Sequence, residues 1–128
     1  MTPIYRHKSA TESDPRGETW ELKGQMLAQV TVCCRKKGSS SCHVHKGEDK
    51  AKDPEQLFIA QGKIVFTLYV PDGSGDHHIV LKAGDEICIP KDVVHKIDIL
   101  EDAIILELRT TEFDPADSDT YPAEIPQA

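Results

Sequence analysis

The central part of the chain, about residues 26 to 110, is a series of short apolar segments separated by turn residues. Several segments alternate apolar and polar side chains with a period of two, which is the pattern of a β-strand. The clearest case is the segment 63–70, where Ile64, Phe66, Leu68 and Val70 share one face. The expected strands are 26–34, 41–45, 55–61, 63–70, 77–82, 86–90, 94–100 and 103–110. Many short strands with close turns and no helical periodicity predict an all-β sandwich or barrel.

Turn residues divide these segments. The run Asp-Gly-Ser-Gly-Asp at 72–76 predicts a hairpin loop, and 83–85 and 101–102 predict further reversals. Residues 111–128 contain three prolines and five acidic residues, which indicates an extended arm over the surface. We therefore expect a single domain spanning 1–128, with its barrel core at about 26–110, an N-terminal segment at 1–25 and a C-terminal arm at 111–128.

Length and composition narrow the functional classes. The chain has 128 residues, the size of one domain, with 38% hydrophobic and 29% charged residues. A net charge of −7 argues against nucleic acid as a partner, because binding phosphates requires clustered Lys and Arg. No segment is long and apolar enough to span a membrane, and the first residues lack the apolar centre of a signal peptide. The four cysteines have no paired spacing, which favours free thiols in a reducing, cytoplasmic setting.

Four residues could together hold a metal ion. His43 and His45 are two positions apart in a predicted strand, so both imidazoles lie on one face. Glu55 shares a face with Leu57 and Ile59, and His95 shares a face with Ile97 and Ile99, so both side chains can point toward the barrel interior. Each of them alone also fits an ordinary surface or hydrogen-bonded core residue. Imidazole and carboxylate ligands suit zinc, iron, manganese or nickel.

The combination resembles the two sequence motifs of the cupin superfamily, G-x5-H-x-H-x(3,4)-E-x6-G and G-x5-P-x-G-x2-H. The residues of this chain that match them are His43, His45, Glu55 and Gly62 for the first motif, and Gly84, Pro90 and His95 for the second. The resemblance implies a cupin-type jelly-roll β-barrel in which His43, His45, Glu55 and His95 bind one divalent metal ion. Zinc is the first expectation, with iron, manganese or nickel as alternatives.

The chain departs from the family pattern in two informative places. Nine residues (46–54) precede Glu55 where the family has three or four, so Glu48 becomes a rival ligand. Glu55 is preferred because only it keeps the six-residue step to Gly62. Asp92 stands where the second motif has glycine, and aspartate is among the few residues that tolerate a positive φ.

The two ends of the chain resemble a narrower group. Asp14-Pro-Arg16-Gly17 resembles the DxRG opening of nucleotide-sugar cupins. The run 103–125 resembles the end of the cupin domain in bifunctional capsular-polysaccharide enzymes that build deoxy-aminosugars, through Phe113, Asp114, Asp119 and Thr120. Those enzymes carry Arg-Gly-Gly just before the HxH, whereas this chain has Ser40-Ser41-Cys42, which weakens the case for a sugar diphosphate.

This resemblance implies a metal-dependent epimerase or isomerase that acts beside a keto group of a sugar nucleotide. The metal would polarise the ketone as a Lewis acid, and a side-chain base would remove the α-proton. The residues available as that base are Lys63, Tyr69, His78 and Lys96. No organic cofactor is expected.

Two other classes remain open. Three histidines and one carboxylate leave coordination positions free, which also suits a dioxygenase or a decarboxylase. A non-catalytic module that binds a small molecule or a sugar in the barrel mouth would fit the same sequence. In each case we expect a homodimer, because small cupins commonly pair and pairing covers exposed sheet edges.

Overall fold

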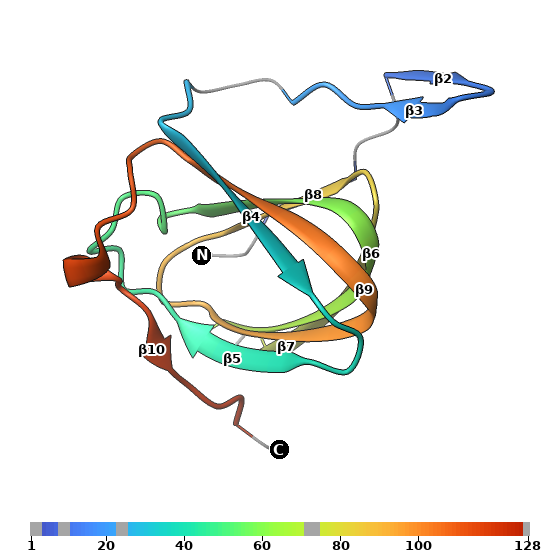
Figure 1. Ribbon diagram of the computed structural model, residues 1–128. Helices are drawn as coiled ribbons and strands as arrows, with labels where there is room; N and C mark the ends of the chain where they lie inside the picture. The colour runs from blue at the N-terminus through green and yellow to red at the C-terminus, as the bar shows by residue number, and fades with distance from the viewer. Residues whose placement is uncertain (1–3, 8–10, 23–25, 71–74, 127–128) are drawn as a thin grey trace.

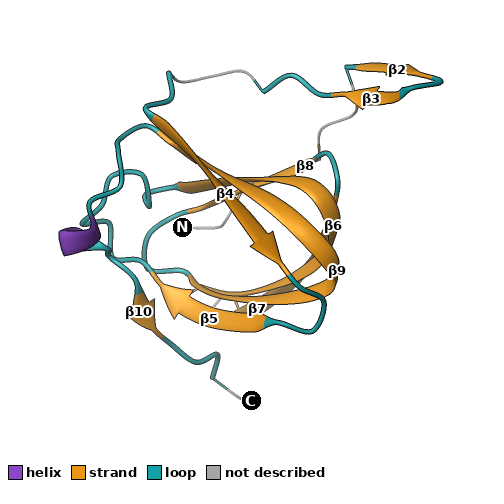
Figure 2. Cartoon of the chain, viewed as in Figure 1, coloured by secondary structure: helices purple, strands orange, loops and turns teal. Residues whose placement is uncertain are grey.

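The computed structural model describes residues 4–7, 11–22, 26–70 and 75–126. Its strands are β1 (Ile4–His7), β2 (Glu12–Asp14), β3 (Gly17–Thr19), β4 (Gln29–Arg35), β5 (Ser40–Val44), β6 (Glu55–Val70), β7 (Gly75–Lys82), β8 (Asp85–Ile89), β9 (Val94–Arg109) and β10 (Tyr121–Pro122). The one helical turn in these ranges is a 3₁₀-helix, η1 (Pro115–Asp117) (Figure 2). Within the same ranges no helix has the length and hydropathy needed to cross a membrane. The prediction of an all-β chain is confirmed.

The barrel is built around one long antiparallel pair, β6 with β9. Each of these strands has 16 residues, and they pair along most of their length. At one half of the pair, β8 lies beside β6 and β4 lies beside β9. At the other half, β7 lies beside β6 and β5 lies beside β9. The pair curves, so its two halves face each other across the interior (Figure 1).

A bulge in β6 produces this curvature. The register between β6 and β9 shifts between Ile59 and Ile64. Within the bulge Gly62 has φ +96°, and a Cβ atom there would lie 2.5 Å from the carbonyl oxygen of Asp102. Only glycine fits such a backbone. The face that points inward also changes, from odd-numbered residues such as Ile59 to even-numbered ones such as Ile64, both fully buried.

The reversal predicted at 101–102 is wrong. Both residues lie inside β9, opposite the bulge, where the strand bends without ending. Their acidic side chains are exposed, because they lie on the outer side of that bend. The hairpin loop predicted at 72–76 lies largely outside the described residues, although β6 and β7, which it would join, are antiparallel neighbours.

The core fills the space between the two halves of the barrel. Its buried members come from β6, β7, β8 and β9 and from the turn before β9, and they are Leu57, Ile59, Ile64, Phe66, Leu68, Leu81, Ile87, Ile89, Val93, Ile99, Ala103 and Ile105. Outside the barrel, the N-terminal segment packs Trp20 edge-on against Phe58, with ring centroids 5.8 Å apart.

One edge of the sheet is open. Among the described strands β4 pairs with β9 alone. Val30 and Val32 on its outward face are 46% and 60% exposed. Edges of this kind are commonly covered by a partner, and the homodimer expected from the sequence remains a prediction.

Candidate metal centre

The fold brings His43, His45, Glu55 and His95 together. Each offers one ligand atom, and these atoms all lie within 4.8 Å of one another. His43 on β5 is directly opposite His95 on β9, and His45 follows on the same face. Glu55 begins β6, at the far end of the long β6–β9 pair from His95. The curvature of that pair brings the two ends to within 3.6 Å, measured from Glu55 Oε1 to His95 Nε2.

Backbone carbonyls fix the orientation of two of the imidazoles. The Nδ1 atom of His45 lies 2.8 Å from the carbonyl oxygen of Asp119, and that of His95 lies 3.0 Å from the carbonyl oxygen of Val93. A carbonyl only accepts, so each Nδ1 must donate, and the lone pair of each neutral ring is then on Nε2. Both Nε2 atoms are buried and have no hydrogen-bond partner among the described residues.

These lone pairs point at a carboxylate. The Nε2 atom of His45 is 3.3 Å from Glu55 Oε2, a contact that becomes a hydrogen bond only when His45 carries a second proton. Lone pairs at this distance repel one another unless a cation lies among them. Neutral imidazoles and a carboxylate form a suitable ligand set for zinc and for other first-row divalent ions. Carbonyl groups behind the rings are the usual outer support of such ligands, so these residues fit a metal ion.

The protonation states of three of the four residues agree with this assignment. Burial, together with the neighbouring His95 and His45, lowers the pKa of His43 to about 4. Burial also lowers the pKa of His95. Burial alone would raise the pKa of Glu55, but the His45 contact and the Lys52 charge hold it well below its usual value. For His45, the pKa is raised, because its contact with Glu55 outweighs burial. A proton therefore competes with a metal ion mainly at His45.

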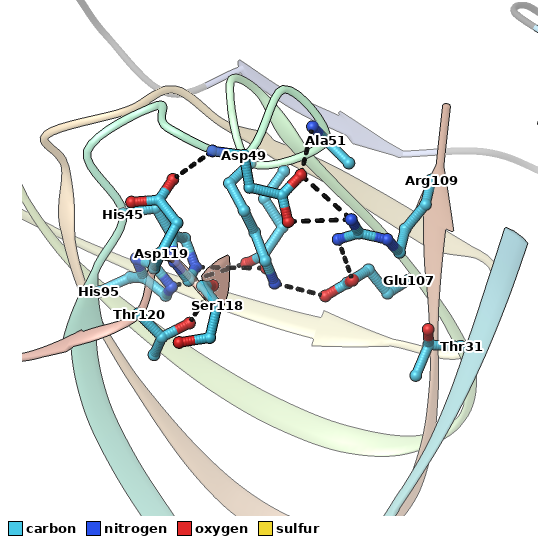
Figure 3. Close-up of polar contacts among 12 residues, drawn as sticks. Thr31, His45, Asp49, Ala51, His95, Glu107, Arg109, Ser118, Asp119 and Thr120 are labelled. Carbon is cyan, nitrogen blue, oxygen red and sulfur yellow. Dashed lines mark hydrogen bonds and ion pairs between the residues drawn. The ribbon is translucent and has the colours of Figure 1, made fainter. Parts of the chain in front are cut away.

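A chain of alternating charges leads away from the cluster. Lys52 Nζ lies 2.8 Å from Glu55 Oε2 and 2.8 Å from Glu107 Oε2. Arg109 then binds Glu107 at 3.1 Å and both carboxylate oxygens of Asp49 at 3.0 and 2.9 Å (Figure 3). The guanidinium is fully buried. The sequence analysis did not single out these residues. Glu107 and Arg109 are odd-numbered like the other inward-facing residues of β9, so the alternation could have placed them inside.

Hydrogen bonds to Asp119 hold the long loop 46–54 in place. The Asp119 carboxylate accepts hydrogen bonds from the backbone N–H groups of residues 46, 47 and 49. Glu48 is exposed and accepts a hydrogen bond from the Tyr121 hydroxyl group, so the rival carboxylate lies outside the cluster. In the second cupin motif, Asp92 has φ +66°, as expected for a residue that replaces a turn glycine.

Three members of the cluster, His43, His45 and Glu55, line a cavity of about 340 Å³. Lys52 and Glu107 also line it, together with the apolar residues Leu57, Ile97, Ile99 and Ile105. The exposed residues of its lining include Arg35, the three serines 39–41 and Thr120. Arg35 supplies a guanidinium at the cavity.

The four residues predicted as possible bases do not lie at this cavity. Lys96 follows the inward-facing His95, so it points outward and is exposed. Lys63 and Tyr69 lie on the outer face of β6 after the bulge. His78 is exposed and hydrogen-bonds the Thr67 hydroxyl group on that same outer face. The parity change at the bulge, which the sequence did not reveal, separates them from the interior.

No protein-family model matches the chain, and no curated protein matches it. Solved structures do match. A mutant of the 3,4-ketoisomerase QdtA from Thermoanaerobacterium thermosaccharolyticum, in complex with TDP-4-keto-6-deoxyglucose, is 16% identical, with 92% of this chain and 85% of that chain covered and a TM-score of 0.70. ChmJ, a 3'-monoepimerase from Streptomyces bikiniensis in complex with dTDP-quinovose, is 14% identical over 94% of this chain and 68% of that chain, with a TM-score of 0.73.

CapF, in a structure with the inhibitor 3-isopropenyl-tropolone, is 24% identical. The match covers 81% of this chain and 30% of that chain, with a TM-score of 0.61. Identities this low establish the fold alone. The chain is a cupin-type jelly-roll β-barrel, as the sequence motifs predicted, and the structures it resembles include ketoisomerases and epimerases of sugar nucleotides.

Proposed function

We propose that the chain is a metal-binding cupin that moves a keto group between neighbouring carbons of a sugar nucleotide. One divalent ion, zinc first and otherwise iron, manganese or nickel, would be held by His43, His45, Glu55 and His95. The observation that carries the proposal is the pair of buried, unpartnered Nε2 atoms, of His45 and His95, that lie close to the Glu55 carboxylate, which lines a cavity. The proposed class of substrate is taken from the ketoisomerase and epimerase structures that share the fold.

The cavity has room for a sugar ring. Its volume is at the lower end of the range for ligand pockets, about 300–1,000 Å³. The apolar residues of the lining can pack against the ring, while the nucleotide extends on the side of the exposed residues. Arg35 is the cation at that side, and a guanidinium matches the geometry of phosphate oxygens.

The polar residues that line the cavity would carry out the proton transfer. A divalent ion bound there supplies Lewis-acid polarisation of the keto oxygen. Of the described cavity-lining residues outside the cluster, Glu107 is the one carboxylate, so it is the base that accepts the α-proton. Lys52 has three N–H donors and uses two on Glu55 and Glu107, so the third can bond the developing oxyanion.

The atoms balance without any co-reactant. The α C–H bond breaks, its proton goes to Glu107, and its electron pair forms the double bond of an enediolate. The hydroxyl proton on the α-carbon moves to the former keto oxygen, and return of the proton to the carbon that bore the ketone then leaves the new ketone on its neighbour. A single carboxylate on one side of the ring suits this transfer better than epimerisation, which needs a proton donor on the opposite face.

The test is solvent deuterium exchange. The zinc-loaded protein is incubated with TDP-4-keto-6-deoxyglucose in D₂O, and the sugar is followed by NMR. We expect deuterium beside the ketone and a new keto isomer, with the rate falling about 10²–10⁴-fold in Glu107→Gln. Glu101→Gln, an exposed residue on the same strand, is the matched control and keeps the wild-type rate.

The other classes would give different results in this assay or in parallel ones. Oxygen consumption by the iron-loaded protein without exchange would identify a dioxygenase, and release of CO₂ from a carboxylated substrate would identify a decarboxylase. Binding of the nucleotide sugar with no exchange under any metal would identify a non-catalytic module. Each of these outcomes rejects the proposed isomerisation.

A further inference from the structure

The C-terminal arm lies along β5, the strand that bears His43 and ends just before His45. After β9 the chain forms η1 and then β10, which pairs with β5 (Figure 1). In this pairing Tyr121 is opposite Val44 and Pro122 is opposite His43. Thr120 lines the cavity. A segment that follows the barrel in sequence therefore forms part of the wall of the site.

Asp119 is the buried residue of this arm. It is 3% exposed, whereas the residues on both sides of it are exposed. Its backbone carbonyl accepts the Nδ1–H of His45 at 2.8 Å. Its carboxylate accepts hydrogen bonds from three backbone N–H groups, those of Lys46 at 2.9 Å and of Gly47 and Asp49 at 3.0 Å. Figure 3 shows the bond from Asp49.

The two sets of contacts depend on each other. Asp119 has φ +49°, a conformation that few residues other than glycine and aspartate or asparagine adopt readily. The three charge-assisted bonds of the carboxylate offset the cost of burying it and of this backbone conformation. They also hold residue 119 against the loop that follows His45. The carbonyl of Asp119 reaches the imidazole only while this attachment lasts.

We infer that Asp119 is a positioning residue for His45. Its carboxylate anchors the arm on the loop 46–49, and the anchored carbonyl fixes the His45 tautomer whose Nε2 lone pair faces the cluster. The inference rests on the proposed metal site. Loss of an outer partner of a metal-ligating histidine typically reduces metal affinity 10–100-fold.

The experiment compares Asp119→Ala and Asp119→Asn with Asp117→Ala, an exposed acidic residue of the same arm. Two quantities are measured: the Kd for Co²⁺ by optical titration, and the His45 tautomer by ¹⁵N NMR of the imidazole in metal-free protein, at a pH high enough for the ring to be neutral. We expect Asp119→Ala to raise the Kd about 10–100-fold and to give averaged tautomer signals. Asp119→Asn should show a smaller change in both, and Asp117→Ala should match the wild type.

An unchanged Kd and an unchanged tautomer in Asp119→Ala, with only a lower Tm, would overturn the inference and leave Asp119 as a loop anchor. If Asp119→Ala does not fold, Asp119→Asn decides by the same two measurements. If the wild type binds no Co²⁺, the proposed metal site fails, and the tautomer in metal-free protein still decides whether Asp119 orients His45.

Discussion

Replacing Glu55 with Gln should reduce the affinity for a divalent ion more than about a hundredfold, beyond the effect of removing an outer-shell partner. The substitution removes the one carboxylate in the cluster and brings an amide N–H₂ group next to the imidazole lone pairs. Glu48→Gln is the matched control, because Glu48 is exposed and its side chain contacts Tyr121. Competition with a chromophoric chelator measures both affinities.

An equal loss in the two variants would show that the carboxylate ligand is assigned to the wrong glutamate. Circular dichroism of the metal-free variants separates loss of metal from loss of fold. This control matters because Glu55→Gln also leaves Lys52 with Glu107 as its one ionised partner.

Replacing Arg109 with Met should lower the free energy of unfolding by about 3–5 kcal/mol, the range for removing one partner of a buried ion pair. Arg109 is fully buried and compensates two carboxylates, Asp49 and Glu107. Without it, Asp49 stays buried without this charge partner, and the loop 46–54 loses one of its attachments to β9, while the Lys52–Glu107 ion pair remains. Urea denaturation in the presence of EDTA measures the change without any contribution from bound metal.

Arg16→Met is the comparison, because it removes an ion pair on the surface, where the Arg16 side chain is 86% exposed. It should leave the free energy of unfolding almost unchanged. A similarly small loss in Arg109→Met would mean that the buried network contributes nothing to the stability of the loop.

The strands and the four-residue cluster could be predicted from the sequence because both depend on local periodicity. Alternation identified the strands, and equal parity placed His43 and His45 on one face. The motif spacing, with Gly62 as its fixed end, selected Glu55 although the preceding loop is longer than in the family. Gly62 has this role because the bulge there leaves no room for a side chain.

The parts that the sequence did not predict depend on contacts between distant segments. Lys52 lies in a loop without periodicity, and its partner Glu107 is 55 positions away. Asp119 was noted only as part of a resemblance, and its contact with His45 spans 74 positions. The bulge reverses strand parity, so residues such as Tyr69 could not be placed inside or outside from their spacing alone.

The central claim is that one divalent ion is bound among His43, His45, Glu55 and His95. Anomalous diffraction from crystals grown with Zn²⁺, recorded on both sides of the zinc absorption edge, tests it directly. The account predicts one strong peak per chain, at about 2.0–2.2 Å from an imidazole nitrogen of each histidine and from a carboxylate oxygen of Glu55. A zinc peak only at other residues, or no peak in crystals with ordered density for all four side chains, would contradict it.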